Sequence, residues 1–208
     1  MATYNYDFVN DKFRDEVIWK TRQNCLVETP LKVICYKDAY VFPFKEGQRG
    51  EVVTADGITL ASDFKEKTSL DKFDTTGLRH GKKAIFVGSL WIYIWGHCFT
   101  DHFNKAWFVN TDECRKLQNE GAELVFISCT TQVPKYIQLI FQYAGIDLHQ
   151  VRMITDPTRF EQLYVPENCY YHTCDKWHRY YTREYLGLLD NIWKNVTKEA
   201  EIAGNYPE

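Results

Sequence analysis

Short apolar runs separated by turn residues mark the chain between residues 31 and 64. Four of them have the composition typical of strands: Val33–Tyr36, Ala39–Phe42, Glu51–Val53 and Ile58–Leu60. The last two flank Asp56-Gly57, and Asp-Gly between apolar runs is a strong hairpin signal. We therefore predict a small antiparallel β meander, preceded by an irregular or partly helical lead-in over residues 1–29.

From residue 84 onward the pattern alternates between strand and helix. Apolar runs that predict buried strands lie at Ala84–Gly88, Glu123–Ser128, Val151–Ile154 and Gln162–Val165. Helical spacing recurs between the first three of them, with one helix beginning near His97, one ending at Gly121 and one stopped by Gly145. This order favours right-handed crossovers and a parallel sheet with helices on both faces.

A long amphipathic helix with an aromatic face is predicted from Trp177 to Glu199. It either caps the sheet or connects to a further part of the protein. The predicted fold class is thus α/β, a Rossmann-like parallel sheet with flanking helices, preceded by the meander. The predicted organisation is a lead-in and meander (1–64), a Rossmann-like domain (65–176), and a helix with a tail (177–208) leading to an absent second lobe.

Composition narrows the class of protein. Hydrophobic residues make up 45% and charged residues 25%, which predicts a folded globular chain. The net charge of -3, without a Lys/Arg cluster, argues against nucleic-acid binding. Seven scattered cysteines, a polar N-terminus and the lack of a membrane-spanning apolar run predict a cytoplasmic protein, with peripheral membrane attachment left open.

The most informative stretch for chemistry is Trp91 to Lys105, which follows a predicted strand and opens a predicted helix. Loops after the carboxyl ends of strands hold ligands in open α/β sheets. His97 and Asp101 lie one helical turn apart, so a carboxylate could orient an imidazole or accept a proton itself. Asn104 and Lys105 fall near the same polar stripe. The alternative is that His97 caps the helix and Asp101 is solvated or pairs with Lys105.

Other candidate residues are weaker. Arg159 could hold a phosphate or a sugar carboxylate, or could pair with Asp156 or Glu161 on the surface. His97, Asp101 and His102 diverge on a helix, and the spacing of Cys169, His172, Cys174 and His178 is not that of a standard zinc knuckle. No metal site is therefore predicted. The sequence also lacks a glycine-rich phosphate loop.

Three segments in order resemble a known family. They are Gly50–Ser62 (GEVVTADGITLAS), Trp95–Asp101 (WGHCFTD) and Thr158–Glu167 (TRFEQLYVPE). Together they resemble the N-terminal half of glycosyltransferase family 61, the capsular-polysaccharide type. The resemblance implies a two-domain enzyme that transfers a sugar from a nucleotide-sugar donor to an acceptor hydroxyl with inversion. The family's second lobe, which carries most donor contacts, is not found in this sequence.

On this hypothesis the chain is the acceptor-side half of a glycosyltransferase of polysaccharide biosynthesis. His97 and Asp101 are the predicted catalytic residues, and the predicted substrate-binding residues are Trp95, Gly96, Asn104, Lys105 and Arg159. The expected partners are a nucleotide-sugar and a saccharide acceptor. No resident cofactor is expected, and the sequence does not indicate whether the reaction depends on a divalent metal. The alternative is a non-catalytic binding or assembly module, which docks or self-associates through the Trp177–Val196 face.

Overall fold

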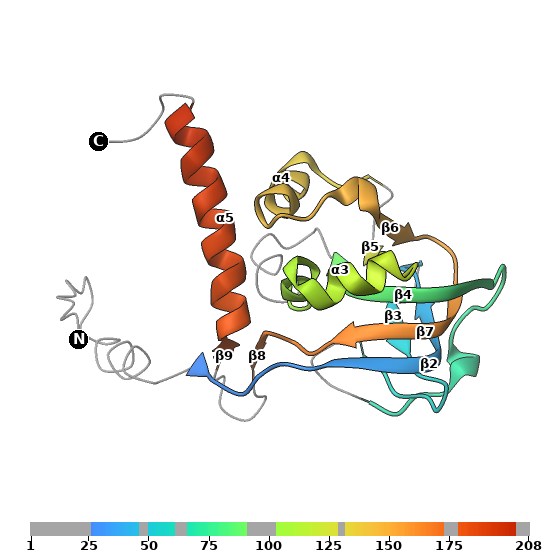
Figure 1. The fold of residues 1–208 in the computed structure, drawn as a ribbon. Helices are drawn as coiled ribbons and strands as arrows, with labels where there is room; N and C mark the ends of the chain where they lie inside the picture. Colours follow the sequence, from blue (N-terminus) through green and yellow to red (C-terminus); the bar gives the residue numbers. More distant parts are fainter. Residues whose placement is uncertain are drawn as a thin grey trace, which may run out of the picture.

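A mixed α/β arrangement is present in the computed structural model, which describes residues 26–45, 50–60, 66–90, 103–128, 132–172 and 179–202 (Figure 1). Within these ranges a curled sheet of six strands is accompanied by three α-helices and a smaller sheet of three strands. The strands are β1 (Leu26–Val27), β2 (Val33–Phe42), β3 (Glu51–Val53), β4 (Arg79–Leu90), β5 (Glu123–Ser128), β6 (Val151–Ile154), β7 (Thr158–Pro166), β8 (Tyr170–His172) and β9 (Arg179–Thr182). The helices are α3 (Asp112–Asn119), α4 (Lys135–Tyr143) and α5 (Arg183–Ile202).

The large sheet has the order β3-β2-β7-β4-β5-β6. Strands β7, β4, β5 and β6 are parallel to one another, whereas β2 is antiparallel to both β7 and β3. The mixed α/β class is therefore confirmed. The expectation of a meander ahead of a separate parallel sheet is corrected, because β2 pairs with β7 from Val33–Pro166 to Val41–Thr158. Hydrophobic patterning marks a strand but does not name its partner.

The sheet curls around an apolar interior. One cluster of buried side chains receives a contribution from every one of the six strands, including Val41, Val52, Phe86, Ile127, Ile154 and Phe160. The curl also brings the start of β3 close to β5, since a side chain at Gly50 would stand 2.4 Å from Cγ2 of Ile127. The first and fifth strands in the order thus approach each other across the concave face.

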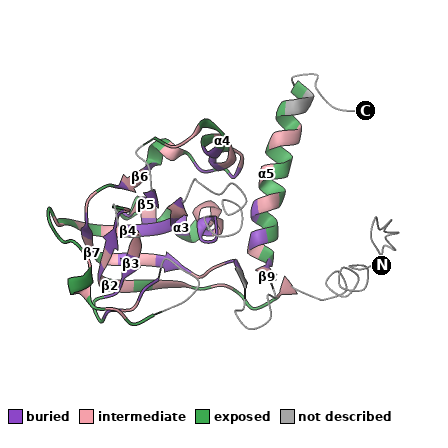
Figure 2. Cartoon of the chain, turned by 180° about the vertical axis from the view of Figure 1, so that it is seen from behind, coloured by how far each residue is buried: buried purple, intermediate pink, exposed green. Residues whose placement is uncertain are grey.

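A second core fills the space between the convex face and the helices. Ile85 and Leu124 from the sheet meet Leu117 of α3, Phe141 of α4 and Leu188 of α5 in this cluster. Successive residues of β5 alternate between the two cores, as the two-residue period of a strand requires. Figure 2 shows buried residues concentrated in the central strands and on the inner sides of the helices. Both faces of β5 and of the second half of β4 are covered, which explains the apolar runs Ala84–Val87 and Leu124–Ile127.

Two irregularities adjust which side chains face which core. In β4 the register to β5 shifts between Phe86 and Gly88, and Gly88 has φ 141°. Val87 and Leu90 consequently both reach the helix-side core, although strict alternation would place them on opposite faces. In β2 the non-glycine residue Asp38 has φ 54°, at the point where inward-facing positions change from Tyr36 to Ala39.

The predicted Asp-Gly hairpin is present. Thr54 N donates to the Ile58 carbonyl at 2.9 Å, and Leu60 N donates to the Val52 carbonyl at 2.8 Å. Gly57 at the turn has φ 83°, a left-handed conformation that glycine adopts without a Cβ clash. The hydroxyl of Thr54 accepts from Ile58 N at 2.8 Å, which adds a side-chain bond to the turn.

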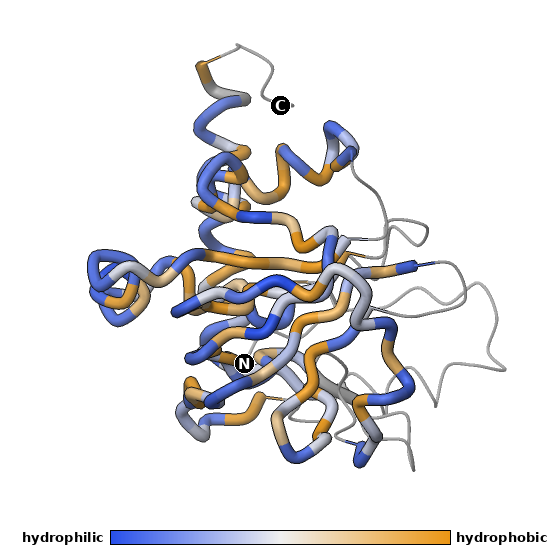
Figure 3. Tube along the Cα trace, turned by 90° about the vertical axis from the view of Figure 1, so that its right-hand side faces the viewer, coloured by the Kyte–Doolittle hydropathy of each residue, from blue (hydrophilic) through white to orange (hydrophobic). Residues whose placement is uncertain are grey.

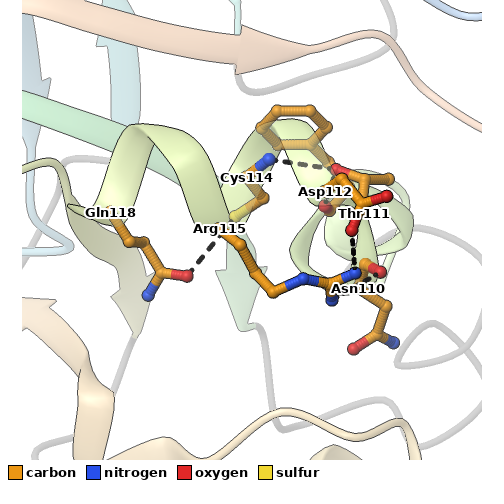
Figure 4. Close-up of polar contacts among 7 residues, drawn as sticks. Asn110, Thr111, Asp112, Cys114, Arg115 and Gln118 are labelled. Atoms are coloured by element: carbon orange, nitrogen blue, oxygen red, sulfur yellow. Dashed lines mark hydrogen bonds and ion pairs between the residues drawn. The ribbon is translucent and has the colours of Figure 1, made fainter. Parts of the chain in front are cut away.

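Helix α3 ends two residues before Gly121, close to the predicted end, and its N-terminus is capped by Thr111. The Thr111 hydroxyl accepts from Cys114 N at 3.2 Å and donates to the Phe108 carbonyl at 2.7 Å (Figure 4). Arg115 donates to the Asn110 carbonyl at 3.1 Å, as Figure 4 also shows. These bonds join α3 to the preceding 3-10 helix, Ala106–Asn110.

Helix α5 begins later than predicted. Residues Arg179–Thr182, expected to be helical, form β9, which pairs with β8 and, in parallel, with β1. Figure 1 shows α5 rising from this small sheet past α4, and Figure 2 shows that its buried positions lie near the end that follows β9. In Figure 3 apolar segments run through the central strands, while much of the molecule's rim is hydrophilic. No described helix combines the length and apolar character needed to cross a membrane.

Candidate functional site

The carboxyl ends of β4 and β5 lie side by side at one edge of the sheet. Their pairing is parallel and continues to the last residues of both strands, Leu90 opposite Ser128. Loops that leave this edge of parallel strands are where α/β proteins hold ligands. The chain after Leu90 carries the predicted catalytic pair, His97 and Asp101.

Four of the predicted site residues lie outside the described residues. They are Trp95, Gly96, His97 and Asp101, in the segment 91–102. The predicted helix start near His97 lies there too. Their roles therefore stay predictions. The two ends of this segment are fixed, since Leu90 and Phe103 are both buried in the helix-side core.

Asn104 and Lys105 lie immediately after this segment and are 4% exposed. The Asn104 side-chain oxygen accepts from Tyr170 N at 2.7 Å, and its carbonyl accepts from Cys169 N at 2.9 Å. The Lys105 ammonium donates to the side-chain oxygen of Asn168. These bonds fasten the chain after Asp101 to the β7–β8 connection. The prediction that both residues contact substrate is not tested by this geometry.

The helical stripe expected around these residues is different in the structure. The sequence predicts Asn104, Lys105 and Phe108 on a polar face, opposite Phe103 and Ala106. All five are buried, and residues 106–110 form a 3-10 helix rather than a continuation of an α-helix. The reason is that residues far along the chain supply hydrogen-bond partners for the two polar side chains, so burial leaves them satisfied.

Cys169, one of the weak zinc candidates, lies in the described part of the chain. Its side chain is fully buried, and burial raises the pKa of the thiol to about 12. The described residues contain no group of three or more His, Cys, Asp or Glu side chains that could hold a metal ion. Cys174 and His178 lie outside the described residues.

Arg159 lies within β7, which begins four residues before the predicted strand Gln162–Val165. Its guanidinium donates to Asp38 at 2.8 Å, and the alternative of a surface pair with Asp156 or Glu161 is not found among the described residues. Asp156 instead pairs with Arg79 at 2.7 Å. The Arg159 Nε is buried without a hydrogen bond to the described residues. Its proposed contact with a phosphate or carboxylate remains a prediction.

A groove of about 810 Å³ runs beside α4, and sequence reasoning missed it. Its walls come from the loop before α4, from one side of the helix and from the segment that leads to β6. The lining residues are Gln132, Val133, Gln138, Gln142, Gly145, Ile146, Asp147, Leu148 and His149. The signal that could have found it is the pair of glutamines one helical turn apart on the polar side of a helix.

A comparison of the chain with protein-family models, with curated proteins and with solved structures gives no match.

Proposed function

We propose that this chain is the acceptor-side half of an inverting glycosyltransferase of capsule or cell-surface polysaccharide biosynthesis, acting in the cytoplasm. The observation that supports this best is the adjacency of the carboxyl ends of β4 and β5 at Leu90 and Ser128. The motif that resembles family 61 follows β4 directly, at the sheet edge that α/β enzymes use for ligands. The type of reaction that we propose is taken from the resemblance to that family.

The fold expected for such an enzyme is part of the proposal. Strands β4, β5 and β6 are parallel neighbours, and the connections between them contain α3 and α4. Consecutive parallel strands joined through helices are the repeating unit of Rossmann-like domains. The proposal assigns β4 to β6 to that unit, with β7, β2 and β3 added at one side.

The proposed chemistry needs one base. As the acceptor oxygen attacks the anomeric carbon, its proton passes to the base, and the bond from that carbon to the nucleoside diphosphate breaks. Asp101 or His97 takes the proton, and the other residue of the pair orients it. Trp95, Gly96, Asn104, Lys105 and Arg159 complete the proposed substrate-binding set. A nucleotide-sugar is the donor and a saccharide is the acceptor.

The test measures sugar transfer by the complete polypeptide that contains these residues. Donors are UDP-glucose, UDP-xylose, UDP-N-acetylglucosamine and GDP-mannose, with neutral trisaccharides as acceptors and mass spectrometry of the products. Asp101→Asn and His97→Ala should each lower transfer by about 10²- to 10⁴-fold without changing thermal unfolding. The matched controls Asp71→Asn and His80→Ala change exposed residues and should transfer normally. Wild-type rates in both site variants would remove the proposed roles.

One observation favours a non-catalytic assembly module as the second candidate. Trp193 and Leu186 on α5 are 66% and 43% exposed, although the helix packs its other side on the body of the protein. Exposed apolar side chains that gather on a helix mark a surface for another protein. Sedimentation of the wild type and of a Leu186→Ala, Trp193→Ala variant tests self-association. A concentration-dependent mass that the variant abolishes supports this candidate, and a monomeric wild type argues against it.

A further inference from the structure

The groove beside α4 has the size and the mixed walls of a small-molecule site. Its volume of about 810 Å³ falls within the range of pockets that bind small ligands. Gln138 and Gln142 line it from the helix, and Asp147 and His149 line it from the segment leading to β6. Val133, Ile146 and Leu148 supply apolar surface between these polar groups.

Two polar side chains in the lining are available to a ligand. The Gln138 amide already donates to the Val133 carbonyl at 2.7 Å, and Asp147 accepts from His149 N at 2.9 Å. The Gln142 amide and the His149 ring, in contrast, make no hydrogen bond with another residue that the structure describes. Both side chains are exposed. An amide offers donors and an acceptor, and a neutral imidazole offers one of each.

The charges in the lining indicate the class of ligand. No Lys or Arg side chain is among the lining residues, and Asp147 contributes a negative charge. Phosphates, sulfates and carboxylates are bound by Arg or Lys, so an anionic ligand is disfavoured. Hydroxyl groups both donate and accept, which matches the amides and the imidazole, and the apolar patches suit the C–H faces of a sugar ring.

We propose that this groove binds a neutral saccharide through Gln142 and His149. The inference rests on the proposed function, and it adds the chemical class of the acceptor and the place where it is held. The groove starts at Gln132 and Val133, shortly after β5 ends at Ser128. Ser128 is the neighbour of Leu90, where the segment with His97 and Asp101 begins. A bound saccharide chain would extend along α4 from that sheet edge.

The test measures saccharide binding to the 208-residue chain by isotope-edited NMR titration, without any donor. The neutral probes are cellotriose, maltotriose, xylotriose, mannotriose and chitotriose, and the anionic probe is trigalacturonic acid. At least one neutral probe should bind and shift the resonances of Gln142 and His149. Gln142→Ala and His149→Ala should each weaken it about five- to tenfold, the effect of one lost hydrogen bond. The control variants Asn119→Ala and His80→Ala change exposed residues outside the groove and should bind normally.

Three results would overturn the inference. One is that none of the neutral probes binds at 20 mM, an order-of-magnitude upper bound for weak sugar binding (about 2 kcal/mol). The second is that Gln142→Ala and His149→Ala bind as the controls do. The third is that trigalacturonic acid binds more tightly than every neutral probe.

A variant carrying both His97→Ala and Asp101→Asn separates this inference from the proposed function. It should lose transfer and keep saccharide binding. Groove-dependent binding in a protein that never transfers sugar would remove the proposed function and leave the groove as a saccharide site. Transfer that continues unchanged in Gln142→Ala and His149→Ala, without detectable binding, would remove the inference and leave the proposed function.

Discussion

Arg159 of β7 donates a hydrogen bond to Asp38 of β2 at 2.8 Å, across 121 positions of sequence. Asp38 is the one non-glycine residue in the described part of the chain with a positive φ, 54°. Aspartate is among the few residues that tolerate this conformation. The ion pair therefore stabilises the irregular backbone at Asp38, where the residues of β2 that face the interior change from one alternating set to the other.

Replacing Asp38 should separate the cost of the backbone from the cost of the ion pair. Asp38→Ala loses the pair and keeps a Cβ in the left-handed region without the polar side chain that makes aspartate tolerate it, for a total of about 1–3 kcal/mol of unfolding free energy. Asp38→Gly also loses the pair but removes the Cβ from the left-handed region, so it should be about 1 kcal/mol more stable than Asp38→Ala. Urea denaturation measures both, with exposed Asp71→Ala as the control. Equal stability of the two Asp38 variants would contradict this account.

Removing the Asn104 side chain should loosen the β8 region. The buried Tyr170 amide would lose its acceptor, at a cost of about 1–3 kcal/mol. Hydrogen exchange of the Tyr170 amide should accelerate in Asn104→Ala, and urea denaturation gives the stability. Lys116→Ala, an exposed change on α3, is the control. Unaltered exchange at Tyr170 would show that the bond does not limit the opening of this region.

Alkaline pH should destabilise the protein through Cys169. Burial raises the pKa of its thiol from 9.0 to about 12. The stabilisation is complete below pH 9 and is lost as pH rises toward 12, because the unfolded thiol ionises first. The stability difference between wild type and Cys169→Ala should therefore shrink by about 1 kcal/mol per pH unit above pH 9. Cys35→Ala removes an exposed thiol and is the comparison. A constant difference from pH 8 to pH 11 would contradict the shift.

A methyl group at Gly81 should collide with Phe160. The added Cβ would lie 2.4 Å from Cε1 of that ring, which is fully buried inside the curled sheet. Gly81→Ala should cost about 1–3 kcal/mol, the usual effect of overpacking. In a Phe160→Leu background the same change should cost at least about 1 kcal/mol less, because the smaller side chain leaves room. Additive effects in thermal unfolding would mean that strain at Gly81 has another origin.

Helix α5 should show opposite sensitivities on its two sides. Leu188 is 3% exposed in the helix-side core, so Leu188→Ala should cost about 2–4 kcal/mol. Trp193 is 66% exposed, so Trp193→Ala should change stability by less than about 0.5 kcal/mol. Chemical denaturation at low protein concentration checks both. A large loss in Trp193→Ala under those conditions would mean that the tryptophan packs on the fold itself.

Local sequence patterns were sufficient to predict a strand where both of its faces are covered. The apolar run Glu123–Ser128 matches β5, since burial on both sides leaves an uninterrupted signal. The run Val151–Ile154 matches β6 as well, although its middle residues, Arg152 and Met153, are only half-buried. β7 was predicted only for Gln162–Val165, although it begins at Thr158. Its first residues include Arg159, whose polar character is explained only by its partner on β2.

The remaining features of the fold depend on contacts between segments that lie far apart in the sequence. Tyr180 and Tyr181 fit a helical stripe equally well, and their strand conformation comes from pairing with β8 and with Leu26. Burial of Asn104 and Lys105 likewise depends on residues 168–170, which lie more than sixty positions away. Single-sequence reasoning cannot supply such partners. It did identify the segment after β4, where His97 and Asp101 stay predictions, and it overlooked the groove along α4.

The position of β7 between β2 and β4 imposes an order on biosynthesis. A nascent chain that has just left the ribosome through β6 holds two sheet fragments, β3-β2 and β4-β5-β6, each with an edge that nothing covers. Only the emergence of Thr158–Pro166 joins them. Uncovered edges invite pairing with other chains, so any polypeptide that stops short of β7 is expected to aggregate instead of folding.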